Sequence, residues 1–321
     1  IHQIHRLMQL KRSAPTERVT LHAAVFNMND PGILEAIIEA HHLGVEVKLI
    51  MDGRKFRPRY EWYWGDERLL EEGVPVLGIM RMEDGAMHNK FILFNGEYLA
   101  TGSMNWEERA RYDNHENMII TSNRELIKAY ARRFESLAGG QKRTRRFAHS
   151  LNAEYSVTFA PDEPSHLHMA QLIREAQSEI LIAMFTAKDV WWDEEGHRTS
   201  LLSEVIKAHQ RGVEVTMVLD HDIHEASEYY GILSDDDPID EWLVEQGIKV
   251  VLADNQRNRY ASMHHKFVII DESITVTGAY NWYYDSAYRN DEDQLVIRDS
   301  QLAARYRDEF KSLLQTYAPH L

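Results

Sequence analysis

The chain has 321 residues, of which 44% are apolar and 27% are charged, and its formal net charge at pH 7 is −15. This is the composition of a soluble globular protein, with room for one large domain or two of about 150 residues. The absence of cysteine excludes disulfide frameworks, thiolate nucleophiles, iron–sulfur clusters and cysteine-ligated zinc. No apolar run approaches the roughly 18 residues of a membrane span, and no signal-peptide pattern opens the chain.

The charge is divided unevenly between the two halves of the chain. Residues 1–150 carry 22 lysines and arginines against 20 acidic residues, whereas residues 151–321 carry 14 against 31. A uniformly basic face for duplex DNA is therefore not expected, although a basic run remains at residues 54–59. We expect a cytoplasmic protein. Because the chain opens with Ile1 rather than Met, secretion after removal of an upstream signal is the alternative.

The chain contains an internal duplication. Two pairs of blocks align without gaps: residues 34–53 with 202–221, and residues 87–106 with 263–282. The offset is 168 in the first pair and 176 in the second, so the later copy carries eight extra residues. Such a match predicts two copies of one unit of about 150 residues. We expect a first repeat at residues 1–145 and a second repeat at residues 146–321.

Each repeat is predicted to be built of α/β elements. In the first repeat, apolar residues at 33, 37 and 38 followed by Gly44 predict a helix, and runs at residues 45–51 and 91–94 predict buried strands. The second repeat has a helical pattern at residues 201–206, Gly212, and strand patterns at residues 213–219 and 267–270. Strand, helix and strand in succession indicate parallel pairing with helices on both faces. We therefore expect an α/β fold with mixed, largely parallel sheets flanked by helices.

Polar residues recur within these apolar segments at the same spacing, two, seventeen, twenty-six and twenty-eight residues after a histidine. They are His88, Lys90, Asn105, Asn114 and Glu116 in the first repeat, and His264, Lys266, Asn281, Asn290 and Glu292 in the second. Burying such groups without partners is costly, so their recurrence requires an explanation. Residues two apart in a strand share a face. Each repeat would thus supply an imidazole, an ammonium and an amide on one side, with a glutamate from a later strand able to reach the imidazole.

This set of groups suits a phosphodiester. The two lysines supply positive charge for the non-bridging oxygens, and the two asparagine amides donate where negative charge develops in a five-coordinate transition state. One neutral histidine can attack phosphorus while a protonated one gives its proton to the leaving oxygen, and Glu116 and Glu292 would fix the tautomer of each imidazole. We expect no metal and no cofactor. A catalytically inactive phosphate-binding protein is the alternative.

The pattern His-x-Lys, four residues, Asp, six residues, Gly-Ser-x-x-Asn resembles the signature of the phospholipase D superfamily, over nearly the whole chain. The second repeat has His264-His265-Lys266, Asp271 and Gly278-Ala279-Tyr280-Asn281, and the first has His88-Asn89-Lys90, Asn95 and Gly102-Ser103-Met104-Asn105. The departures are Asn95 in place of an aspartate that the family uses structurally, and Ala279 in place of a serine. Only the first repeat then offers a hydroxyl, that of Ser103, near the phosphate.

The resemblance implies two repeats packed about a pseudo-twofold axis, with both motifs meeting at one pocket and a reaction through a phosphohistidine. It also implies that the amino-terminal histidine attacks phosphorus, so we expect His88 to be the nucleophile and His264 the general acid. Because the duplication already supplies internal symmetry, we expect a monomer.

The substrate is less well defined, because the superfamily contains lipases, transphosphatidylases, cardiolipin synthases and nucleases. The Met-His-x-Lys-Phe and Thr-Gly-x-x-Asn-Trp stretches resemble the bacterial endonuclease and piRNA-pathway nuclease branch. Apart from Ser103, the expected substrate-binding residues are Arg54, Arg57, Arg257, Trp62 and Trp64. With Arg81 these arginines would form a positive funnel for a single nucleic-acid strand whose bases stack on the tryptophans. The alternative is a phospholipase D that hydrolyses or transfers a lipid headgroup, its tryptophans dipping into the lipid interface.

Overall fold

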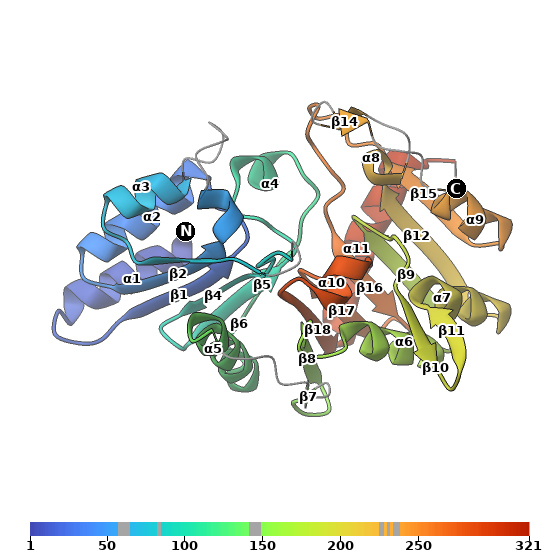
Figure 1. Ribbon diagram of the computed structural model, residues 1–321, viewed down its shortest axis with the longest axis horizontal. Helices are drawn as coiled ribbons and strands as arrows, with labels where there is room; N and C mark the ends of the chain where they lie inside the picture. The colour runs from blue at the N-terminus through green and yellow to red at the C-terminus, as the bar shows by residue number, and fades with distance from the viewer. Residues whose placement is uncertain are drawn as a thin grey trace.

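The computed structural model describes residues 1–56, 65–81, 85–140, 149–224, 228–229, 232–233 and 238–320. These residues form two α/β units, each built around one main sheet, and the two units lie side by side (Figure 1). Within the described ranges, no helix combines the length and the apolarity that crossing a bilayer requires.

The first unit has a six-stranded sheet in the order β3-β2-β1-β4-β5-β6. Its strands are β1 (Thr20–Val25), β2 (Glu46–Asp52), β3 (Val76–Ile79), β4 (Lys90–Phe94), β5 (Tyr98–Gly102) and β6 (Met118–Thr121). One face packs against α1 (His2–Ser13), α2 (Pro31–His42) and α3 (Gly65–Glu71), and the other against α5 (Arg124–Ala138). The 3₁₀ turn η1 (Gly53–Phe56) follows β2, and the short helix α4 (Glu108–Tyr112) precedes β6.

The second unit has an eight-stranded sheet in the order β15-β12-β9-β16-β17-β18-β8-β7. Its strands are β7 (His149–Ser150), β8 (Tyr155–Ala160), β9 (Glu179–Met184), β12 (Glu214–Asp220), β15 (Lys249–Ala253), β16 (Lys266–Ile270), β17 (Ile274–Gly278) and β18 (Glu292–Arg298). One face packs against α6 (Ser165–Glu175), α7 (Leu201–Gln210) and α9 (Ile239–Glu245), and the other against α11 (Ser300–Tyr317). Shorter elements are α8 (His221–His224), α10 (Tyr284–Tyr288) and the pairs β10 (Trp191–Glu194) with β11 (His197–Ser200) and β13 (Glu228–Tyr229) with β14 (Ile232–Leu233).

The expected α/β fold with mixed sheets is confirmed, but the sheets are only partly parallel. Parallel pairing joins β1, β2 and β3 in one sheet and β9, β12 and β15 in the other. The remaining pairs are antiparallel, and among them β4 reaches β5, and β16 reaches β17, through turns too short for a crossover. The expected boundary between residues 145 and 146 lies in segment 141–148, outside the described residues.

The two predicted glycine helix ends are present. Gly44 and Gly212 have φ of 88° and 95°, a backbone conformation that side chains disfavour. After α2 the amide of Val45 donates to the carbonyl of Ala40 at 3.0 Å, and an equivalent bond closes α7. The chain therefore turns directly from each helix into β2 or β12, the strands that lead to the site.

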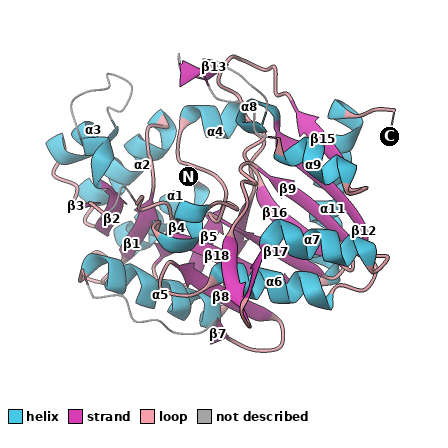
Figure 2. Cartoon of the chain, turned by 45° about the vertical axis from the view of Figure 1, so that its right-hand side comes forward, coloured by secondary structure: helices cyan, strands magenta, loops and turns pink. Residues whose placement is uncertain are grey.

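The two units share a hydrophobic core. Helix α5 of the first unit packs on its own sheet and also on β8 of the second (Figure 2). Tyr130 of α5 meets Phe91 at 5.0 Å and Phe159 at 5.2 Å between ring centroids. Leu295 and Ile297 of β18 belong to the same buried cluster. This shared core fixes the position of one motif relative to the other.

Candidate active site

The segments that carry the two histidines pair with the opposite repeat. The amide of His88 donates to the carbonyl of Asp291, and the amide of His264 donates to the carbonyl of His115, both at 3.0 Å. The reverse bonds, from the amides of Asp291 and His115 to the chain before each histidine, are 2.7 and 2.9 Å. Because Asp291 and His115 each precede a glutamate, this exchange brings the glutamate of one repeat to the histidine of the other.

Each imidazole is bonded to a carboxyl group from the other repeat. Nδ1 of His88 lies 2.7 Å from Oε2 of Glu292, and Nδ1 of His264 lies 2.6 Å from Oε1 of Glu116. All four side chains are 12% exposed or less. The sequence spacing predicted that a glutamate would reach each imidazole but did not specify that the pairs cross between repeats.

The two motif lysines are buried beside the histidines. Nζ of Lys90 donates to the carbonyl of His88, and Nζ of Lys266 donates to the carbonyl of His264, both at 2.7 Å. Burial lowers the pKa of Lys90 to about 8 and that of Lys266 to about 7. An entering phosphodiester anion would stabilise the charged form of both lysines.

The two histidines and the two lysines of the motifs influence one another electrostatically. Burial, with Lys90 and Lys266 nearby, lowers the pKa of His88 to about 4 despite the neighbouring Glu292. Burial, together with Lys266, Lys90 and His88, also lowers the pKa of His264 well below its ordinary value. Together with the crossed imidazole–carboxyl pairs and backbone bonds, these influences show that the two motifs form one site.

The glutamates are held by hydroxyl and amide donors from their own repeats. Glu116 accepts from Ser103 at 2.6 Å, and Glu292 accepts from Ser286 at 2.8 Å. Ser286 on α10 thus supplies the hydroxyl that Ala279 lacks. The side chain of Ser103 is fully buried and its hydroxyl holds the carboxyl group of Glu116, so its contact with substrate remains a prediction.

The two imidazole–carboxyl pairs can hold different numbers of protons. Burial raises the pKa of Glu116 to about 8, a direction that favours a second proton on the pair of Glu116 and His264. In the other pair, the tautomer of His88 with its proton on Nδ1 would donate to Glu292 and leave a lone pair on Nε2.

Two phenylalanines that the sequence reading missed pack against the catalytic pairs. The rings of Phe26 and Phe185 lie edge-on to His88 and His264, with centroids 4.9 and 4.6 Å apart. Nζ of Lys90 is 5.4 Å from the centre of Phe26, and a matching contact of 4.8 Å joins the second repeat's lysine and phenylalanine. Both phenylalanines directly follow an inner parallel strand, β1 or β9, and this shared position is the signal that could have identified them.

The asparagines of the motif, Asn105 and Asn281, follow β5 and β17 and are both buried. The side-chain oxygen of each has no hydrogen-bond partner among the described residues. Each amide therefore has a polar atom that is not used in hydrogen bonds within the described residues. Phosphate binding by these groups remains a prediction.

The strands β2 and β12 end in equivalent aspartates that hold the histidine segments. Asp52 accepts from the amide of Met87, and Asp220 accepts from the amide of Met263, both at 2.8 Å. Asp52 also accepts from Nε of Arg54 at 2.8 Å, whereas residue 222, at the position equivalent to Arg54, is an aspartate. Burial, with Asp222 nearby, raises the pKa of Asp220 to about 8.

We expect Asp220→Asn to stabilise the protein at alkaline pH. The pKa of Asp220 is higher in the folded than in the unfolded chain, so its contribution to stability is present below about pH 4 and is lost as the pH rises toward 8. Asparagine can still accept from Met263 but carries no charge. We expect the melting temperature at pH 8 to rise by about 2–4 °C. A variant that is less stable than the parent at pH 8 would contradict this account.

The arginines expected to form a positive funnel are engaged within the protein. Besides the pairing of Arg54 with Asp52, Arg81 donates through Nη2 to Asp291 at 2.7 Å, and Arg257 donates to the carbonyl of Tyr112 at 3.1 Å. These contacts occupy part of each guanidinium group, and phosphate binding by Arg54, Arg81 and Arg257 remains a prediction. Arg57, Trp62 and Trp64 lie outside the described residues.

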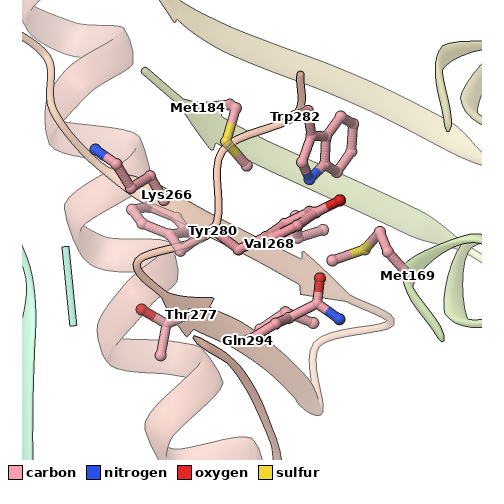
Figure 3. Close-up of a pocket in the computed structure, with 10 residues that line it drawn as sticks. Met169, Met184, Lys266, Val268, Thr277, Tyr280, Trp282 and Gln294 are labelled. Atoms are coloured by element: carbon pink, nitrogen blue, oxygen red, sulfur yellow. The ribbon is translucent and has the colours of Figure 1, made fainter. Parts of the chain in front are cut away.

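A small cavity lies behind the second motif (Figure 3). The stem of Lys266 lies at its edge, while the amino nitrogen points away from Met169 and Trp282 (Figure 3). The hydroxyl of Tyr280 and the indole nitrogen of Trp282 are buried there without partners among the described residues. The cavity therefore lies on the side away from the ammonium group and belongs to the packing of the motif.

A family model described as cardiolipin synthase, PLD-like domain, matches residues 8–138 and 169–314. The chain belongs to the phospholipase D superfamily. The two matched segments correspond to the two repeats, so the duplication read from the sequence is a duplication of this domain.

Curated relatives of this phospholipase D-like chain cover part of it. The mitochondrial cardiolipin hydrolase of Xenopus tropicalis is 33% identical over 125 residues, which cover 37% of this chain and 54% of the relative. A phospholipase D of Rickettsia bellii is 29% identical over 116 residues, covering 36% and 55%. The chain thus spans about half the length of these relatives. The crystal structure of phosphatidylserine synthase from Haemophilus influenzae Rd KW20 shares the fold, with a TM-score of 0.66 at 13% identity over 98% of this chain and 84% of that one.

Proposed function

We propose that this protein cleaves phosphodiesters through a covalent phosphohistidine, with His88 as the nucleophile and His264 as the proton donor. One observation carries the proposal: two buried imidazoles, each bonded through Nδ1 to a carboxyl group of the opposite repeat, share a site with two buried lysines. Membership of the phospholipase D superfamily supports the same chemistry.

The hydrogen-bonding pattern supports the assignment of roles. The lone pair on Nε2 of His88 attacks phosphorus and forms an N–P bond while the bond to the leaving oxygen breaks. The leaving oxygen takes the proton from Nε2 of His264, while the second proton of the pair with Glu116 ends on Nδ1, so the imidazole is neutral after the step. Water then attacks the phosphohistidine, gives a proton back to His264 and releases His88. Lys90 and Lys266 would neutralise the non-bridging oxygens throughout.

The activity should follow a bell-shaped pH profile whose acid limb belongs to His88 and whose alkaline limb belongs to the two motif lysines. Protonation of His88 removes the attacking lone pair, so activity should fall as the pH drops through about 4. Loss of the ammonium charge, first on Lys266 and then on Lys90, should weaken the hold on the phosphate as the pH rises through about 7 and then about 8. The measurement is kcat/KM from pH 3 to 10 on a protein shown to stay folded. A profile that rises monotonically over this range would contradict the assignment.

We propose single-stranded nucleic acid as the substrate, because three exposed tyrosines, each with an arginine guanidinium over its ring, lie close to the motif residues in the sequence. Tyr112, Tyr260 and Tyr284 are 57%, 39% and 56% exposed. Each lies within four residues of a motif residue, namely Asn114, His264 and Asn281. The pairs are Arg111 over Tyr112 (5.0 Å), Arg259 over Tyr260 (5.8 Å) and Arg289 over Tyr284 (5.1 Å). The aromatic faces carry this proposal, because Arg111 and Arg289 also pair with Asp30 and Asp285 and stacking on aromatic rings is how proteins bind unpaired bases.

A phospholipid headgroup is the second candidate substrate. The curated relatives are named for cardiolipin hydrolysis and phospholipase D activity, and the catalytic pairs would act on either kind of phosphodiester. Trp191 on β10 is 42% exposed, and such a side chain favours a membrane interface.

The substrate can be assigned by incubating the protein in EDTA with labelled single-stranded DNA, single-stranded RNA, or vesicles containing cardiolipin or phosphatidylcholine. We expect cleavage of a nucleic acid strand, at a rate that falls about tenfold between 50 and 200 mM salt as about three phosphate contacts are screened. The matched control is the His88→Gln variant. Cleavage of lipid alone would retain the mechanism and replace the substrate, whereas no cleavage of any substrate would contradict the proposed function.

A further inference from the structure

A second group of titratable side chains joins the two repeats beside the active site. His115 of the first repeat, His265 of the second and Glu309 of α11 each direct one possible ligand atom to a common point, with all three atoms within 4.8 Å of one another. Nε2 of His265 lies 3.1 Å from Oε1 of Glu309, and Nδ1 of His115 lies 3.8 Å from the same oxygen. The mechanism uses none of these side chains.

The internal duplication allows this group of side chains to be compared with the equivalent residues of the other repeat. A shift of 176 residues relates Asp291 to His115 and Arg133 to Glu309. At that equivalent position the guanidinium of Arg133 is 4% exposed and donates to Asp291 at 2.7 Å. The positive charge of Arg133 therefore lies between the repeats at this position. The equivalent position holds the carboxylate of Glu309 with the imidazoles of His115 and His265, a set of side chains that binds cations.

We propose that His115, His265 and Glu309 form a binding site for a divalent metal ion of the zinc type, which connects the two repeats. Two imidazole nitrogens and one carboxylate oxygen are ligands that Zn²⁺ takes. Tetrahedral bonds of about 2.0 Å place ligand atoms about 3.3 Å apart, and the distances of 3.1 and 3.8 Å lie on either side of that value. The side chain of Glu309 is 43% exposed, which gives an ion access and leaves a position for water.

Neighbouring side chains orient both imidazoles. Nε2 of His115 bonds to the hydroxyl of Tyr317 at 2.7 Å, so Nδ1 faces Glu309. Nδ1 of His265 lies 3.2 Å from the amide nitrogen of Asn117, so Nε2 faces Glu309. When Nε2 binds the metal, Nδ1 carries the proton and requires an acceptor. Rotation of the Asn117 amide by 180° provides its oxygen.

The contacts of the Asn117 oxygen allow this rotation. This oxygen now accepts from Thr277 at 2.6 Å and from Tyr306 at 3.1 Å. After the rotation the amide nitrogen would donate to these two hydroxyl oxygens, which can also accept. The rotation gives up the long bond from the amide nitrogen to Ser103, at 3.3 Å, and provides an acceptor for Nδ1 of a metal-bound His265.

The proposed ion would have a structural role. The carbonyl of His115 accepts from the amide of His264, so the ion would fix the backbone at the start of the second motif. The pair of Arg133 and Asp291 does the same for the first motif, since the carbonyl of Asp291 accepts from His88. This inference does not depend on the reaction or the substrate proposed above.

The test is metal binding by the full chain after treatment with EDTA and removal of the chelator. Calorimetric titration with Zn²⁺ should show one strong site, and Co²⁺ should give the visible absorption of a tetrahedral complex. One equivalent of Zn²⁺ should raise the melting temperature by about 3–6 °C. His115→Gln and Glu309→Gln should each weaken binding at least tenfold, while His197→Gln, a change at an exposed histidine, should not.

The melting temperatures of the variants in EDTA show whether each one is folded, so loss of binding can be separated from loss of structure. No Zn²⁺ binding by the folded parent protein would overturn the proposal. Binding that survives both His115→Gln and Glu309→Gln would also overturn it. If instead His221→Gln abolished binding, the ion would belong to His221, Asp222 and Asp254, which also lie within 4.8 Å of one another, and the proposed site would be wrong.

Discussion

Replacing His88 with glutamine is expected to lower kcat by about 10⁴-fold or more, because the variant lacks the lone pair that attacks phosphorus. Glutamine retains a polar group near Glu292, and the imidazole of His88 contributes little to the core beyond its contact with Phe26 at 4.9 Å. We therefore expect the melting temperature to change little. The measurement is single-turnover cleavage of the substrate, with His197→Gln as the control for a surface histidine.

The His264→Gln variant separates the roles of the two histidines. With a substrate whose leaving group needs no proton, such as a nitrophenyl phosphodiester, His88 of this variant should still be phosphorylated. Hydrolysis of the intermediate should be slow, since water loses its base. Mass spectrometry should then find the phosphoryl group on residue 88. Its appearance on His264 in the His88→Gln variant alone would reverse the assigned roles.

Replacing Arg133 with methionine is expected to lower the free energy of unfolding by about 3–5 kcal/mol. Arg133 is buried between the repeats and donates to Asp291 at 2.7 Å and to Asp162 at 2.6 Å. Without Arg133, Asp291 keeps Arg81 but loses its buried partner, and burial already raises the pKa of this carboxyl group. Activity should also fall, because Asp291 holds the backbone of His88. Urea unfolding measures the first effect.

Two comparisons test the physical cause of this loss. Arg12→Met removes an exposed ion pair with Glu39, whose side chains are 53% and 54% exposed, and should change the stability by about 0.5 kcal/mol or less. Adding Asp291→Asn to Arg133→Met should recover part of the loss, because it removes a buried charge that only Arg81 would still pair. If Arg133→Met were no more harmful than Arg12→Met, the buried ion pair would not be what joins the repeats.

The sequence by itself determined the features that depend on local spacing. The gapless match between the repeats identified the duplication, and the apolar runs located β2, β4, β12 and β16. Gly44 and Gly212 marked two helix ends, because a positive φ is a property of one residue and its neighbours. The shared interval between His88 and Lys90, and between His264 and Lys266, was enough to predict the motif lysines beside the histidines.

Only the tertiary structure decided which groups from distant segments meet. The pair of Glu292 with His88 joins residues 204 positions apart, and no periodicity within one repeat specifies that contact. The same reason explains why Arg81, expected to face the substrate, pairs with Asp291. The structure also shows that Ser286 on α10, rather than residue 279, supplies the hydroxyl to Glu292. These contacts depend on how the shared core packs one sheet against the other, and that packing is set by the shapes of many side chains together.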